Sequence, residues 1–75
     1  MGLETLKDSF QFEQTDPAAT WTINHNLGTL VPYVECWIDF SGTYSKVIPS
    51  NITMVDENTV TVDFTVAQVG RAAVV

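Results

Sequence analysis

The sequence predicts a small all-β protein, a compact antiparallel β-sandwich or open barrel of about seven short strands. The first observation behind this prediction is that apolar and polar residues alternate in short segments along the chain. The second is that Gly, Pro, Asn and Asp separate these segments, as expected of turns. The third is that a helical period extends over no more than about one turn, near Leu3 to Lys7.

The individual strands are expected where the alternation runs between two turn signals. Asp16-Pro17 should end the first strand, because proline fixes φ and removes a backbone donor. Ser41-Gly42 predicts a hairpin turn, and residues 67–70 should turn the chain before its last strand. The seven expected strands are residues 9–13, 20–24, 33–40, 43–48, 52–55, 59–66 and 71–75.

A chain of 75 residues makes one domain, expected at residues 9–75 behind an N-terminal arm at residues 1–8. A domain of this size has a thin core and usually needs a disulfide, a metal or a partner chain to stabilise it. The single cysteine excludes an intrachain disulfide, and one cysteine with one histidine excludes a four-ligand zinc site. We therefore expect a homo-oligomer.

Nine acidic residues against three basic ones give a net charge of −6. A nucleic-acid-binding protein would cluster Lys and Arg against phosphates, whereas Lys7, Lys46 and Arg71 are scattered among acids. The small number of basic residues also argues against binding to an anionic membrane surface. No apolar run approaches the roughly 20 residues of a membrane span. Residues 1–6 lack the features of a signal peptide. We expect synthesis in the cytoplasm and neither a nucleic-acid nor a membrane partner.

The segment from Tyr33 to Phe40 carries the most informative side chains. If Val34, Cys36, Ile38 and Phe40 face the core, alternation sends Tyr33 and Trp37 to the opposite face. Aromatic residues are enriched in protein interfaces and their hot spots, so these two are interface candidates. Two alternatives stay open: another part of the chain covers them, or they form an aromatic platform for a sugar.

The last strand is apolar on both faces, with Ala72 and Val74 on one and Ala73 and Val75 on the other. Such a strand is either central in the sheet or pressed against a symmetry-related copy. Ala73 and Val75 are therefore interface candidates together with the two aromatics.

We find no catalytic constellation, and the chain is not expected to be an enzyme. His25 is the only histidine, and no nucleophile elbow, phosphate loop or metal-binding helix accompanies it. We expect His25 to bond the backbone at the turn that follows it. Cys36 should be an inert buried thiol. No catalytic, metal or cofactor-binding residue is predicted.

One segment resembles a known family. The run from Pro17 to Gly28, PAATWTINHNLG, resembles a signature common in small β-modules of bacteriophage structural proteins, with Trp21, His25 and Gly28 as its structural residues. Later elements follow in the order of that family: Pro32, Ser41-Gly42, Pro49, the block from Asp56 to Val62, Phe64 and Gly70-Arg71-Ala72. Cys36-Trp37 and the ending Ala73-Val74-Val75 depart from the family's pattern.

The resemblance implies a structural protein of a phage virion, made in the host bacterial cytoplasm, and trimers are common among such parts. Because the module starts at its own Met1 with no shaft or attachment domain, we favour a capsid decoration (cement) protein. It would stabilise the head by binding the major capsid protein on the outer capsid surface. The alternatives are a tail-fibre or neck component acting in attachment, and a carbohydrate-binding module.

Overall fold

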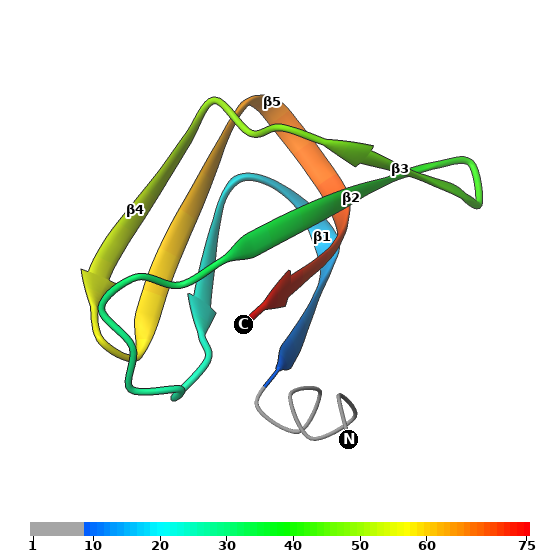
Figure 1. The fold of residues 1–75 in the computed structure, drawn as a ribbon. Helices are drawn as coiled ribbons and strands as arrows, with labels where there is room; N and C mark the ends of the chain where they lie inside the picture. The colour runs from blue at the N-terminus through cyan, green and yellow to red at the C-terminus, as the bar shows by residue number, and fades with distance from the viewer. Residues whose placement is uncertain (1–8) are drawn as a thin grey trace, which may run out of the picture.

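The computed structural model describes residues 9–75, which form five β-strands (Figure 1). The two longest strands lie near the ends of the chain and the three shorter ones lie between them. The strands are β1 (Phe10–Asn24), β2 (Val34–Phe40), β3 (Thr43–Val47), β4 (Asn51–Asp56) and β5 (Thr59–Val74). All pairings are antiparallel, which confirms the predicted fold class.

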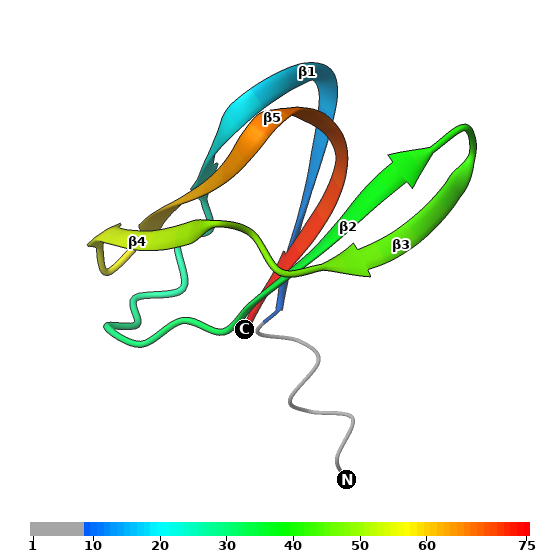
Figure 2. The same cartoon turned by 90° about the horizontal axis from the view of Figure 1, so that it is seen from above.

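Strand β5 organises the sheet, because three other strands pair with it. Its first half pairs with β4 and with the end of β1, and its second half pairs with the start of β1 and with β2. Strand β3 adds to the outer side of β2. Both β1 and β5 bend between their halves, so one sheet folds over onto itself (Figures 1 and 2).

The bend replaces two predicted breaks, and this is where the strand prediction was wrong. The stop at Asp16-Pro17 and the turn at residues 67–70 both fall inside continuous strands. The register between β1 and β5 shifts between Gln14 and Ala18, and again before Thr20. Proline is tolerated at such irregularities because no ladder hydrogen bond is required of it there. Seven expected segments thus become five strands, two of them long and bent.

The core lies between the two halves of the folded sheet. Its buried residues alternate along each strand, as a period of two requires. They are Trp21, Ile23, Cys36, Ile38, Val60, Val62, Ala72 and Val74. The last strand segment is therefore central in the sheet, between β1 and β2, as one of the two open interpretations had it.

Phe40, which was expected on the core face, is exposed, and so is Val66, which continues the alternation of Val60, Val62 and Phe64 along β5. Phe40 is the last residue of β2, next to the hairpin turn, and Val66 lies within the bend of β5. Phe40 lines an open hollow together with Phe64, Thr65 and Gln68 of β5, and this hollow leaves its ring exposed. The hairpin itself is confirmed: Ser41 and Gly42 have φ of 55° and 92°, values favoured at a two-residue turn of this kind.

Candidate functional site

The outer face of the second half of the sheet carries the most unusual set of side chains. Strand register places Glu13 opposite Arg71, Arg71 opposite Trp37, and Trp37 opposite Lys46. One row of side chains therefore crosses β1, β5, β2 and β3. A second row places Ala73 between two polar neighbours on the flanking strands, which are Gln11 and Glu35.

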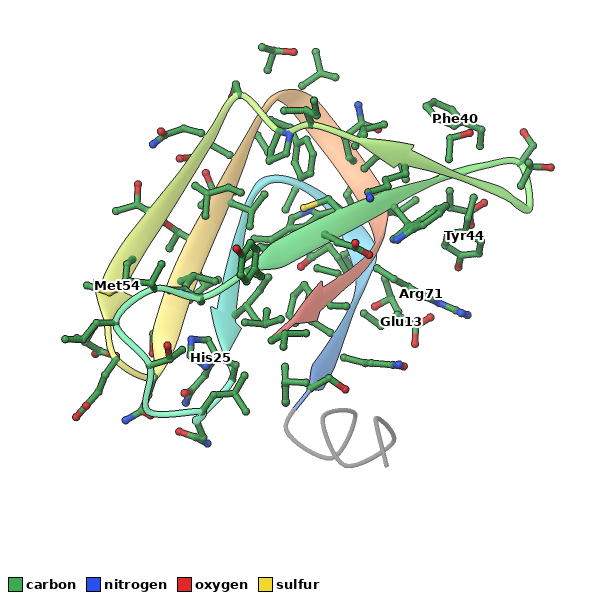
Figure 3. All side chains as sticks on the ribbon, viewed as in Figure 1. Glu13, His25, Phe40, Tyr44, Met54 and Arg71 are labelled. Atoms are coloured by element: carbon green, nitrogen blue, oxygen red, sulfur yellow. The ribbon has the colours of Figure 1, made fainter. Side chains whose placement is uncertain are left out.

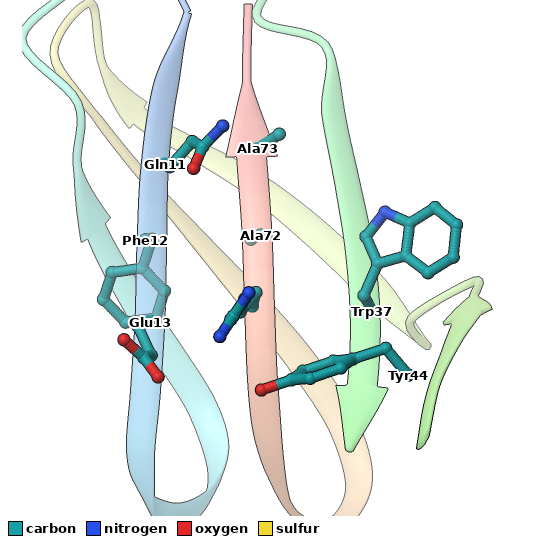
Figure 4. A pocket seen from close by; sticks show the side chains of 8 residues that line it. Gln11, Phe12, Glu13, Trp37, Tyr44, Ala72 and Ala73 are labelled. Carbon is teal, nitrogen blue, oxygen red and sulfur yellow. The ribbon is translucent and has the colours of Figure 1, made fainter. Parts of the chain in front are cut away.

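These rows enclose a groove of about 560 Å³ (Figure 4). Gln11 and Glu13 of β1 stand on one side, and Trp37 of β2 and Tyr44 of β3 stand on the other. The remaining lining residues are Phe12, Arg71, Ala72 and Ala73. The groove opens because the central strand contributes alanine at residue 73, between longer side chains on both neighbouring strands.

Charged side chains of both signs lie in the groove and beside it. The Arg71 guanidinium lies over the Tyr44 ring, 4.7 Å from its centroid, a cation–π contact. Beside it, Lys46 Nζ lies 3.3 Å from Glu35 Oε2. Glu13 is the register partner of Arg71, but within residues 9–75 no ion pair joins these two side chains. The Arg71 guanidinium and the Glu13 carboxylate thus face the same groove without neutralising each other by direct contact.

The structure places all four sequence-predicted interface residues on this outer face. Trp37 and Ala73 line the groove. Tyr33 and Val75 lie beyond it as a hydrogen-bonded pair, in which each backbone N–H donates to the other residue's carbonyl at 2.9 Å. Tyr33 is 77% exposed and Trp37 37% exposed, so the described residues leave Tyr33 largely open and cover Trp37 in part.

Sequence reasoning missed the other groove residues Gln11, Glu13, Tyr44 and Arg71. Alternation alone assigns each to a face of its own strand, but it does not say which strands are neighbours. The pairing of Glu13 with Arg71 joins residues far apart in the sequence. The signal that would have found the groove is the strand order, which the sequence left open.

The signature residues serve the fold. Trp21 is fully buried, and its indole N–H donates to the carbonyls of Ala18 at 3.1 Å and Gln68 at 3.2 Å. It therefore joins the bend of β1 to the bend of β5. Its ring packs near those of Phe12 and Phe64, with centroids 6.0 and 4.7 Å away.

His25 and Gly28 shape the loop after β1. The Leu27 backbone N–H donates to His25 Nδ1 at 3.0 Å, so His25 bonds the backbone at the turn. Its Nε2 is buried and has no partner. Gly28 has a φ of 64°, and its N–H donates to Asn58 Oδ1 at 3.0 Å. The loop is thereby fixed to the turn between β4 and β5.

A second surface is apolar and lies at β4. Ile52 and Met54 are the register partners of the core residues Val62 and Val60 and point to the same face, yet both remain about 40% exposed. Within residues 9–75 strand β4 pairs only with β5, so no described strand lies beside its other edge.

The loop before β2 adds two further apolar side chains to this region. The Thr29 N–H donates to the Glu57 carbonyl at 2.8 Å, which brings the loop to the end of β4. Leu30 and Val31 follow it and are 69% and 79% exposed. We name Leu30, Val31, Ile52 and Met54 the open edge. Figure 3 shows Met54 on the opposite side of the molecule from the groove residues Glu13, Tyr44 and Arg71.

The single cysteine, Cys36, is buried in the core. Burial raises the pKa of the Cys36 thiol to about 11, which keeps it protonated and unreactive at neutral pH. Residues 9–75 contain no cluster of three or more His, Cys, Asp or Glu able to hold a metal ion. They also contain no helix long and apolar enough to cross a membrane.

No protein-family model matches the chain, and no curated protein or solved structure matches it either.

Proposed function

We propose that this chain is a structural protein of a bacteriophage virion that works as a homo-oligomer, with a trimeric capsid decoration protein as the favoured role. The observation that carries the oligomer is the amount of exposed apolar surface. Within residues 9–75, eleven large hydrophobic side chains are exposed, against eight hydrophobic residues in the buried core. Exposed apolar surface marks an interaction site where the side chains lie close together, as Ile52 and Met54 do on one face of β4.

The open edge is the surface we assign to contact between copies. Ile52 and Met54 face the core side of the sheet, so a neighbouring chain that covered them would extend the core. The free edge of β4 carries neither lysine nor proline, two residues that commonly protect edge strands, and its pairing with β5 is regular from Asn51 to Met54. A second copy can therefore add both apolar contacts and backbone hydrogen bonds at this place.

The assignment to a phage virion rests on the resemblance of the run from Pro17 to Gly28. Its residues Trp21, His25 and Gly28 hold the bend and the first loop. The signature therefore encodes the fold, and a shared signature supports a shared fold with the phage modules. The role on the virion must come from surface residues, which are the part of the chain that departs from the family's pattern.

A decoration protein acts by mass action: bound across neighbouring capsid subunits, it stabilises the shell in proportion to its occupancy. The proposed partner is thus the major capsid protein, and the proposed location is the outer capsid surface.

Imaging purified virions that carry a labelled copy of this chain tests the role. Decoration predicts hundreds of labels distributed over the head. Labels restricted to the tail or neck, in few copies, would contradict decoration and favour the attachment role instead.

A further inference from the structure

We propose that the groove between β1 and the β2–β3 hairpin is a binding site for a neutral saccharide. This inference goes beyond the virion role and does not depend on it. Four features carry it: the shape of the groove, an exposed tryptophan on its wall, three planar polar side chains, and the balance of charge.

The groove has the dimensions of a ligand site. Its volume of about 560 Å³ lies within the roughly 300–1,000 Å³ typical of small-molecule sites. Both β1 and β2 pair with β5, so the groove walls stand two strand spacings apart, about 9.5 Å between backbones. Between these walls, Ala73 of β5 has a short side chain and leaves the bottom of the groove open. A channel of this form accepts a sugar ring or a short linear glycan.

Trp37 supplies an aromatic wall. Its side chain belongs to the outer face of β2, is 37% exposed and lines the groove, and Figure 4 shows its indole extending from β2 on the side away from β5. A pyranose ring presents a face of C–H groups, which carry partial positive charge and pack against the negative face of an aromatic ring. Tyr44 is less available for such packing, because the Arg71 guanidinium already lies over its ring.

Gln11, Glu13 and Arg71 supply hydrogen-bonding groups. Each ends in a planar group with at least two donors or acceptors, which matches the paired hydroxyls of a sugar. The cation–π contact with Tyr44 holds the Arg71 guanidinium at the groove in advance of binding. Glu13 and Arg71 are not joined by an ion pair within the described residues, so a ligand does not first have to break one.

The charges select a neutral ligand. Within the groove, the negative charge of Glu13 offsets the positive charge of Arg71. Beside it, Glu35 and Lys46 form an ion pair. The chain as a whole carries a net charge of −6, which repels acidic glycans. Polyhydroxyl groups without charge are the chemistry that this lining matches best.

The test is an array of immobilised neutral and acidic oligosaccharides, probed with the full chain and with variants. Wild type is expected to bind members of the neutral set. Ala73→Ile should abolish binding by filling the floor without removing any contact group. Trp37→Ala and Glu13→Gln should each weaken binding at least tenfold. Phe40→Ala, an exposed aromatic outside the groove, is the matched control and should bind like wild type.

A titration with the best neutral ligand gives a second readout. Trp21 is fully buried and Trp37 is part-exposed, so ligand binding should reduce quenching of tryptophan fluorescence by acrylamide through Trp37 alone. Circular dichroism verifies that each variant is folded. If Ala73→Ile and Trp37→Ala destabilise the fold, Glu13→Gln still tests the site, because it changes an exposed side chain.

Several results would overturn the inference: no retained glycan, retention of acidic glycans only, or wild-type binding by Ala73→Ile. If glycans are not retained and Ala73→Ile instead changes the mass in solution, the groove is covered by a second copy and the saccharide site is refuted. The saccharide site can fail while the oligomer stands, because the open edge lies on the other side of the molecule.

Discussion

Replacing Trp21 by phenylalanine should destabilise the protein far more than the same replacement at Trp37. Trp21 is fully buried, and its N–H bonds two carbonyls, those of Ala18 and Gln68, at the bend of the sheet. Losing these contacts costs about 1 kcal/mol. The smaller ring leaves a void on the order of 40 Å³, which adds about 1 kcal/mol. The expected loss is therefore about 2 kcal/mol in the free energy of unfolding.

Trp37 provides the matched control, because the substitution is the same and the side chain is part-exposed with no hydrogen bond of its indole in the described structure. Trp37→Phe should change the free energy of unfolding by no more than about 0.5 kcal/mol, as is usual for surface positions.

Chemical denaturation followed by far-UV circular dichroism, at equal protomer concentration, measures both variants. In a thermal melt the loss at Trp21 corresponds to a decrease of roughly 8–16 °C in Tm. Equal effects of the two substitutions would refute the argument that Trp21 joins the bends of β1 and β5.

Three further outcomes are expected. Gly70→Ala should strongly destabilise the fold, because a Cβ there would overlap the Trp37 carbonyl oxygen, and a wild-type Tm would contradict this close approach. His25→Ala should lower the free energy of unfolding by about 1 kcal/mol in a denaturant titration, because the part-buried Leu27 N–H loses its acceptor. Cys36 should react with a thiol reagent at pH 8 only after unfolding. Its thiol ionises near pH 9 when unfolded and near 11 when folded, so stability should fall as pH rises from 9 to 11, and Cys36→Ala should remove that part of the fall.

The sequence predicted the local structure well where alternation was regular. The pattern from Val34 to Ile38 placed Cys36 and Ile38 inward and Trp37 outward, as the structure has them. The residues around Ser41-Gly42 predicted the hairpin because few sequences accept positive φ at two successive positions. In both cases the local structure is determined by residues within one strand or one turn.

The sequence failed where the structure depends on distant segments. Pro17 signals a break in any local reading, and only the irregular pairing with β5 lets the strand continue through it. Alternation would place Ile52 and Met54 in the core, and they do point to the core face. They stay exposed because β4 lies at the edge of the sheet, a fact of strand order that no local pattern contains.

Dependence on strand order also explains which residues of the candidate site could be predicted from the sequence. Trp37 and Ala73 were recognised because their own strands gave them an unusual outer face. Glu13 and Arg71 were not, because their place in the groove follows from the pairing of β1 with β5.

The mass of the protein in solution tests the central proposal most directly. Light scattering at several concentrations should give three times the 8.3 kDa of one chain. Met54→Glu should give the monomer mass, since an unpaired charge buried at the open edge costs about 3–5 kcal/mol. Ile48→Glu introduces the same charge at a position that is 95% exposed and should leave the mass unchanged. A wild-type mass of 8.3 kDa at every concentration, or an oligomer that Met54→Glu leaves intact, would contradict the account.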